Sequence, residues 1–174
     1  MSELKQILDS IRGGDKAAFE VLYEGMKKPL FTIILRITQD FTLSEDILQE
    51  LFLKIYFTPH ENTANPRAYL CQMARNLAID SVRKQKQEAG LEEAESRSWH
   101  PQESLSANID IENALLALSD RDRQIVTLHI NGGLKFREIA ATMGIPLGTV
   151  LWAYRKAIGQ LRGILAAYTQ TTQT

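Results

Sequence analysis

Five basic side chains share the segment 66–87 with an aromatic ring and an amide, a combination suited to holding nucleic acid. The residues are Arg67, Arg75, Arg83, Lys84 and Lys86, with Tyr69 and Asn76 among them. Cations neutralise phosphates, and aromatic rings support bases that have left a stack. A helix surface in contact only with water can have the same composition, so the pattern alone leaves both interpretations open.

The sequence offers no arrangement typical of an enzyme or a metal site. The histidines, His60, His100 and His129, lack metal-ligand spacing, and the acidic residues form no pair suited to acid–base catalysis. No glycine-rich phosphate loop is present. We therefore expect a binding protein that is not an enzyme and uses no metal or cofactor, with His129 in a packing or surface role.

A second surface of interest lies on the expected helix 45–57. Its apolar stripe, Ile47, Leu48, Leu51, Phe52 and Ile55, predicts a core-facing side. The opposite side carries Asp46, Gln49, Glu50, Leu53, Lys54 and Phe57. This is either a solvated face with stray apolar residues or a docking face, where carboxylates and an amide bind a partner and Leu53 adds apolar contact.

The segment 136–165 has the pattern of a helix-turn-helix. Residues 136–144 have helical spacing and end at Gly144, which can take the left-handed conformation that closes a helix. A second helix is expected from about Gly148 to Val150 onward. Its apolar face consists of Val150, Tyr154, Ala157, Ile158, Leu161 and Leu165. Such a unit places its second helix in the DNA major groove.

The remaining pattern is helical, which predicts an all-α protein of two small helical domains. Helices are expected at 3–12, at 15–26 with a break or restart at Pro29, from a Ser44 N-cap to about Phe57, and from an Asn65 cap and Pro66 to about Gln87. Ser119 is expected to cap a further helix, and the tail after Tyr168 to fray. The boundaries are a first domain at 1–88, a linker at 89–108 and a helix-turn-helix domain at 109–174.

Charge and composition agree with this division. The net charge is −1, but residues 109–174 hold seven basic and five acidic residues. Within 89–108 four glutamates face one arginine, which is typical of a solvated linker. The single cysteine, Cys71, lies in an apolar helical pattern and is expected in the core. Because no secretion signal or long apolar run is found, we expect a cytoplasmic protein without membrane insertion.

Several short motifs follow one another along the chain. They are residues 46–52 (DILQELF), 66–70 (PRAYL), 74–80 (ARNLAID), 118–123 (LSDRDR), 138–140 (EIA) and 148–150 (GTV). In their order and spacing these motifs resemble those of bacterial sigma factors of the extracytoplasmic-function (ECF) type. No single motif is decisive, but the resemblance extends from about Asp15 to Leu165.

The resemblance implies RNA polymerase core and promoter DNA as partners, and leaves open whether an anti-sigma factor exists. The β′ clamp helices would bind Asp46, Gln49, Glu50, Leu53 and Lys54. The −10 element would meet Tyr69, Arg75, Asn76, Asp80 and Arg83 during strand opening. The −35 element would meet Arg137, Thr149, Leu151, Trp152, Arg155 and Lys156, while the second domain also touches the β flap. The linker would pass through polymerase toward the RNA exit path.

Two departures from the family pattern stand out in the second domain. The recognition helix has Leu151 and Trp152 where the family has basic or polar residues, and Lys135 and Pro146 replace the usual serine caps. We expect Leu151 and Trp152 to be exposed. They would pack within the chain, contact thymine methyls, or form a patch that binds a regulator or keeps the free protein closed. If the patch closes the protein, Trp152→Lys should expand it in solution scattering.

Two other functions remain compatible with the residues. One is a helix-turn-helix regulator that binds duplex DNA without polymerase, although a dimeric regulator would leave the first domain unexplained. The other is a sigma-like adaptor that binds polymerase and reads DNA poorly, which the reduced basicity of the recognition helix favours.

Overall fold

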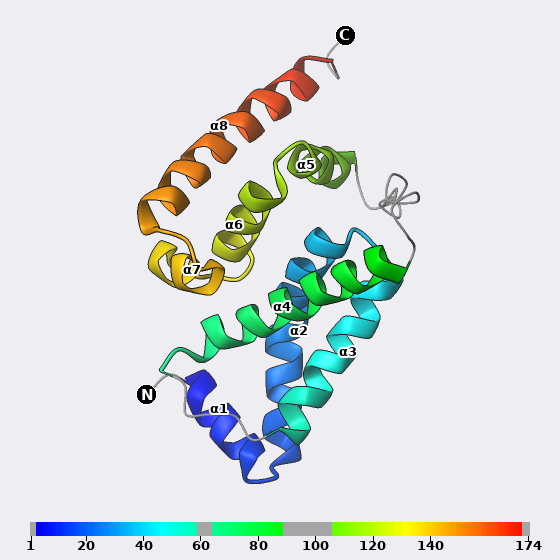
Figure 1. Ribbon diagram of the computed structural model, residues 1–174, viewed down its shortest axis with the longest axis vertical. Helices are drawn as coiled ribbons and strands as arrows, with labels where there is room; N and C mark the ends of the chain where they lie inside the picture. The colour runs from blue at the N-terminus through cyan, green and yellow to red at the C-terminus, as the bar shows by residue number, and fades with distance from the viewer. Residues whose placement is uncertain (1–2, 59–63, 89–105, 172–174) are drawn as a thin grey trace. The chain divides into compact units, whose positions relative to one another are not determined.

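The computed structural model describes residues 3–58, 64–88 and 106–171, and their regular structure is entirely α-helical, as predicted. The chain divides into two compact units, residues 1–98 and 99–174. The first contains α1 (Glu3–Arg12), α2 (Lys16–Thr38), α3 (Phe41–Phe57) and α4 (Pro66–Glu88). The second contains α5 (Ser106–Leu116), α6 (Asp120–Ile130), α7 (Phe136–Met143) and α8 (Leu147–Thr171). Figure 1 shows the helices of each unit.

The long helix α2 is the centre of the first unit. It packs against α1, α3 and α4, and α4 also contacts α3 (Figure 1). The core includes the fully buried side chains of Leu30, Ile34, Leu51 and Leu70. Cys71, which follows Leu70 in the sequence, is also completely buried, and this confirms its predicted place in the core.

Pro29 does not break the second helix, contrary to the sequence-based expectation. α2 runs without interruption from Lys16 to Thr38 with Pro29 inside it. Proline removes one helical hydrogen bond and crowds the carbonyl four residues earlier. That residue is Gly25, which is exposed, so its carbonyl can be hydrated. Met26 and Leu30 are buried on either side of Pro29, and this packing outweighs the local cost.

The third helix also begins earlier than predicted, because Asp40 rather than Ser44 is its N-cap. The Asp40 carboxylate accepts a hydrogen bond from the Leu43 N–H at 2.9 Å. Gln39 has φ 55°, a left-handed conformation that ends α2 and turns the chain immediately into α3. Ser44 is fully buried inside α3, and its hydroxyl lies 2.7 Å from that of Thr38.

In the second unit α8 contacts α5, α6 and α7, so it holds the unit together. Its core cluster contains Leu115, Leu118, Val126 and Ala157, with Tyr154 and Leu161 packed against it. α5 begins at Ser106, so residues 106–108, expected in the linker, are helical. The rest of the expected linker, residues 89–105, lies outside the described residues.

The helix-turn-helix has the predicted turn but slightly different helix ends. Gly144 has φ 66° and closes α7, as expected for a left-handed C-cap. α8 begins at Leu147, just before the predicted start, and continues to Thr171 where fraying was expected from Tyr168. None of the helices in the described ranges combines the length and hydropathy needed to cross a bilayer.

The N-termini of α6 and α7 are capped in different ways. The Ser119 hydroxyl accepts from the Asp122 N–H at 3.2 Å, as predicted. Lys135 precedes α7 and has no side-chain acceptor to act as a cap. Instead, the Glu138 carboxylate reaches back and accepts from the Lys135 N–H at 2.7 Å. Half of a capping box therefore remains without a serine.

Candidate nucleic-acid and partner interfaces

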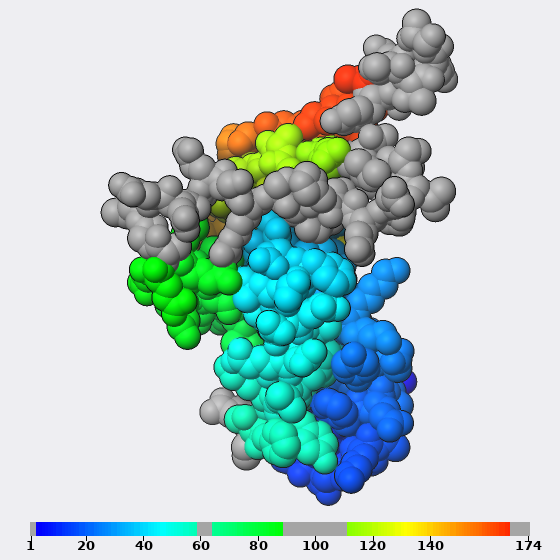
Figure 2. Space-filling model, turned by 90° about the vertical axis from the view of Figure 1, so that its right-hand side faces the viewer, coloured from blue at the N-terminus to red at the C-terminus, as the bar shows by residue number. Residues whose placement is uncertain are grey.

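The outward side of α3 presents the polar residues that the sequence places there. Exposed side chains in this set are Asp46, Gln49, Glu50, Leu53 and Lys54. Leu53 is 56% exposed and Phe57 72% exposed, while Lys54 lies 2.8 Å from Glu50 one turn away. Figure 2 shows α3, in cyan, forming much of one face of the first unit. The face is therefore a mixed polar and apolar surface on a helix whose other side is in the core.

Helix α4 gathers most of the predicted strand-binding residues on one side. Tyr69, Asn76, Asp80 and Arg83 lie at i, i+7, i+11 and i+14, which places them on one face. Asn76, Asp80 and Arg83 are exposed, and Tyr69 is half-buried. The start of α4 is fixed as predicted, since the Asn65 side-chain oxygen accepts from the Ala68 N–H at 3.1 Å.

Arg75 differs from the other predicted contacts on α4. It lies on the flank of that face and is half-buried. Desolvation lowers the pKa of Arg75 from its ordinary value. Because an arginine starts from so high a value, the guanidinium remains cationic at neutral pH. Arg75 thus contributes positive charge at the edge of the face.

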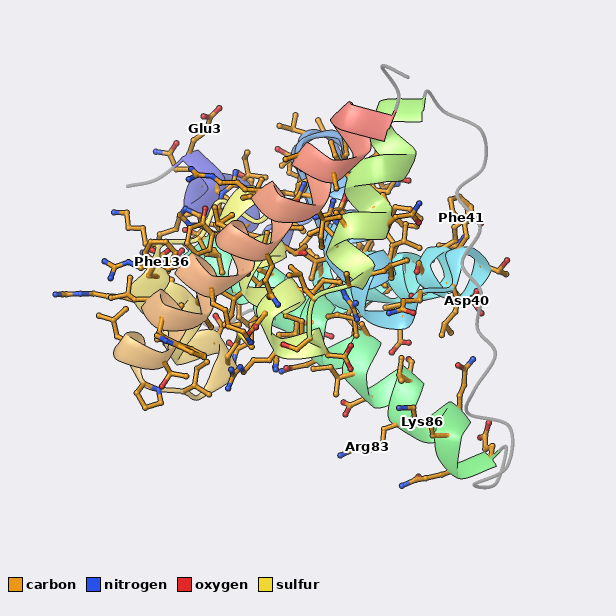
Figure 3. The ribbon with its side chains drawn as sticks, turned by 90° about the horizontal axis from the view of Figure 1, so that it is seen from above. Glu3, Asp40, Phe41, Arg83, Lys86 and Phe136 are labelled. Atoms are coloured by element: carbon orange, nitrogen blue, oxygen red, sulfur yellow. The ribbon has the colours of Figure 1, made fainter. Side chains whose placement is uncertain are left out.

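The C-terminal part of α4 carries cations with only loose partners. Arg83 lies 2.9 Å from Asp80, and their side chains are 69% and 62% exposed. Lys84 lies 3.9 Å from Glu88, and both are largely exposed. Arg83 and Lys86 project from this end of the helix in Figure 3. Water solvates all these groups, so little free energy is needed to separate the pairs.

The predicted duplex-reading surface of the second unit lies on α7 and the first turns of α8. Arg137, Arg155 and Lys156 are exposed, and Trp152 is 59% exposed as expected. Thr149 and Leu151 are half-buried, so Leu151 is less exposed than expected. The opposite side of α8 is anchored by Val150, Ala153 and Ala157, all completely buried.

Lys156 has an intramolecular arrangement that local sequence patterns did not reveal. Its Nζ lies 3.2 Å from an Asp122 carboxylate oxygen and 5.4 Å from the centre of the Trp152 ring. Asp122 is completely buried, and Arg121 Nε lies 3.4 Å from its other oxygen. The i, i+4 spacing of Trp152 and Lys156 could have suggested the ring contact. The carboxylate is distant in sequence and could not be foreseen.

Of the packing and surface roles expected for His129, the structure shows packing. Its ring stacks on Phe136 with centroids 4.4 Å apart and meets the Tyr154 ring edge-on at 5.0 Å. Nδ1 lies 2.8 Å from the Leu134 carbonyl, which can only accept, so Nδ1 donates. His129 thereby joins α6, the connector before α7, and α8. No group of three metal-binding side chains occurs within 3–58, 64–88 and 106–171.

Both units of the chain match family models of the same class of protein, the Sigma-70 factors. Residues 22–88 match the Sigma-70 region 2 family model, and residues 109–160 match the Sigma-70 region 4 model. An ECF RNA polymerase sigma factor, SigK of Mycobacterium ulcerans, is 27% identical, with 95% of each chain covered. SigW of Bacillus subtilis, also an ECF sigma factor, is 26% identical over 84% of this chain and 88% of SigW. The chain belongs to the ECF sigma factors.

This ECF sigma factor therefore acts in promoter-specific initiation of transcription by RNA polymerase. Its fold is also found in other proteins of known structure, among them the sigma factor RpoE. RpoE, solved with the anti-sigma factor NepR from Bartonella quintana, has a TM-score of 0.71 at 24% identity, with 85% of this chain and 96% of RpoE covered. CnrH, solved with the cytosolic domain of CnrY, has a TM-score of 0.68 at 18% identity, with 94% and 97% covered.

Proposed function

We propose that the two units divide promoter recognition between them. Residues 1–88 bind the β′ clamp helices through α3 and hold the opened −10 element on α4. Residues 109–174 read the −35 duplex and touch the β flap, and residues 89–108 connect the two through polymerase. The observation that carries this proposal is the outward side of α3, where carboxylate, amide and apolar groups share one exposed face.

The α3 face suits a protein partner better than a nucleic acid. Asp46 and Glu50 are exposed carboxylates, which DNA phosphates would repel. Leu53 is 56% exposed on the same side of α3, one turn after Glu50, and offers the apolar contact that protein interfaces need. α3 is held by its buried side, so little conformational entropy is lost when the face binds.

The α4 face suits single-stranded DNA. Tyr69 supplies a ring for an unstacked base, and Asn76 supplies hydrogen bonds to base edges. Asp80 accepts hydrogen bonds, and Arg75 and Arg83 supply positive charge for the backbone. Binding to splayed bases offsets the few kcal/mol that unpairing costs. Because α4 is a rigid helix anchored in the core, these groups are already placed when the strands separate.

The second unit suits intact duplex DNA. Its helix-turn-helix presents Arg137, Thr149, Leu151, Trp152, Arg155 and Lys156 on α7 and the start of α8. A helix fits the major groove, where base pairs are distinguishable. The surface mixes cations with apolar groups, so we expect base reading to depend on both.

Substitution on α3 tests the proposed division directly. Gln49→Ala combined with Glu50→Ala should weaken binding to core polymerase by about tenfold, since hydrogen bonds at a buried interface are lost. Run-off transcription should fall in parallel and recover at high sigma concentration. The Glu50–Lys54 pair is exposed, so its loss should leave the fold intact.

A matched control uses the same residue types elsewhere in the first unit. Gln6 and Glu20 are exposed on α1 and α2, and Gln6→Ala with Glu20→Ala should leave polymerase affinity unchanged. If the α3 variant binds polymerase as tightly as this control, the α3 face has no place in the interface and the proposal fails.

We also propose that this sigma factor works in the cytoplasm without catalytic chemistry of its own, and that an anti-sigma protein controls it. The support is its family and the complex of the similarly folded RpoE with NepR. Capture of the tagged chain from its own cells should return a second protein that competes with core polymerase. A captured protein that binds together with polymerase would contradict this control.

A further inference from the structure

Lys156 occupies a surface expected to bind DNA, yet its ammonium group is already used within the second unit. It lies 3.2 Å from Asp122 and above the Trp152 ring at 5.4 Å. A carboxylate from α6 and an aromatic ring from α8 therefore meet at one cation. A lysine that serves only as a phosphate contact would extend into solvent on its flexible stem.

The carboxylate of Asp122 keeps Lys156 in place. Asp122 is completely buried, whereas the Lys156 side chain is 42% exposed. Removing the partner of a buried charge is costly, because the remaining ion has lost its water. Arg121, the residue before Asp122 on α6, is a second partner of the carboxylate at 3.4 Å. Without Lys156, Arg121 would be the remaining cation paired with Asp122 among the described residues. Transfer of Lys156 to a phosphate is therefore opposed by the charge it would leave behind.

The pairing of Lys156 with Asp122 also places the Lys156 ammonium against the exposed ring of Trp152. Trp152 precedes Lys156 by one turn of α8, and the ammonium lies over the face of its ring. The ring is nevertheless 59% exposed. Leu151 beside it is half-buried. The result is an exposed apolar ring at the start of α8, with the ammonium of Lys156 over its face and paired with the buried carboxylate of Asp122.

We propose that Trp152 is a specificity-determining residue that contacts a thymine methyl in the −35 major groove, and that Lys156 is the positioning residue that holds its ring. The inference rests on the proposed reading of the −35 duplex by the second unit. The thymine C5-methyl is the apolar feature of the major groove and matches an apolar side chain. Arg155, exposed on the same helix, is left to neutralise phosphate.

The first test removes one methyl group from the DNA. Reconstituted holoenzyme selects its preferred −35 duplex from a randomised library, and each thymine in turn is replaced by deoxyuridine. At one position the replacement should weaken wild-type binding about fivefold, since a tenfold change corresponds to about 1.4 kcal/mol and one methyl supplies less. Trp152→Ala should bind both duplexes equally. If no deoxyuridine weakens binding, or Trp152→Ala still distinguishes them, the proposal is overturned.

The second test separates positioning from phosphate binding by salt dependence. Arg155→Met should reduce the slope of log affinity against log salt by about 0.9, the loss of one phosphate contact. Lys156→Met should leave the slope unchanged while reducing discrimination at the thymine. A slope loss in Lys156→Met equal to that in Arg155→Met would overturn the positioning role. If neither Arg155→Met nor Trp152→Ala affects binding to any duplex, the proposed −35 function itself is wrong.

A spectroscopic test follows the ring without DNA. The chain has two tryptophans, Trp99 and Trp152, so Trp99→Phe leaves Trp152 as the only indole emitter. In this background Lys156→Met should make the ring more accessible to acrylamide, and Lys156→Arg should restore the wild-type quenching. Asp122→Asn with Lys156→Met removes both charges, so it keeps the test available if the single variant does not fold. Unchanged quenching in a folded Lys156→Met variant would contradict the proposal.

Discussion

Cations on α4 and on α8 are held in different ways, although both helices are proposed to bind DNA. Arg83 and Lys84 on α4 pair with Asp80 and Glu88, and all four side chains are mostly exposed. Lys156 on α8 pairs with a carboxylate that is completely buried. The first pairs separate at little cost because water replaces each partner, whereas the second cannot separate without leaving a charge in the core.

A count of basic residues therefore overestimates the positive charge that is available to DNA. On α4 Arg83 and Lys84 can each exchange a carboxylate for a phosphate, which suits a strand whose backbone adopts several paths. On α8 the charge of Lys156 is held by Asp122, so Arg155 and the exposed ring of Trp152 are the groups expected to meet the duplex. The two units thus differ in how freely their cations can change partners, as well as in the form of DNA that each is proposed to bind.

The largest expected effect is on the stability of the second unit. Lys156→Met should lower its free energy of unfolding by about 2 kcal/mol, because buried Asp122 keeps only Arg121 as a charged partner. Urea unfolding followed by circular dichroism measures this. Lys84→Met is the matched control and should change stability by less than about 0.5 kcal/mol. Equal effects of the two variants would remove the distinction between the helices.

Next in size is the contribution of a loosely held cation to strand binding. Arg83→Gln should weaken holoenzyme binding to a promoter with a pre-opened −10 element by about threefold, and reduce the salt slope by about 0.7, the value for one contact with a single strand. Fluorescence anisotropy at several salt concentrations measures both. Arg12→Gln on α1 also removes an arginine from an exposed pair and should have no effect; a similar loss there would show that Arg83 acts only through net charge.

The smallest expected effect concerns the carboxylate beside Arg83. Asp80→Asn should change the free energy of unfolding by only a few tenths of a kcal/mol, since an exposed pair contributes little. Thermal and urea unfolding of the first unit provide the measurement. A loss above about 1 kcal/mol would mean that the α4 pairs are structural too, and that the contrast with Asp122 is one of degree.

The sequence predicted the helices and the buried side of α3 well, because the periodic spacing of apolar residues indicates which side of a helix faces the core. Local rules were weaker where tertiary packing competed with them. Pro29 was expected to interrupt α2, but buried neighbours keep the helix continuous. Ser44 was a plausible cap, but Asp40 offers a cap one turn earlier, and Ser44 is buried instead.

The sequence predicted which residues of the candidate sites are exposed, but not the contacts that these residues make. Exposure of Glu50, Leu53 and Trp152 follows from helical spacing, which is local information. The contact between Lys156 and Asp122 joins residues 34 apart in sequence, and no pattern within one helix encodes it. Leu151 is half-buried, which the spacing of apolar residues along its own helix did not predict.

The complete burial of Cys71 makes this chain convenient for labelling. It is the single cysteine of the sequence and has no exposed surface, so alkylating reagents should reach its thiol only when the core opens. A cysteine introduced at an exposed position of each unit would react first. Two dyes could then report how far apart the units move when polymerase is added, with the native thiol left in place.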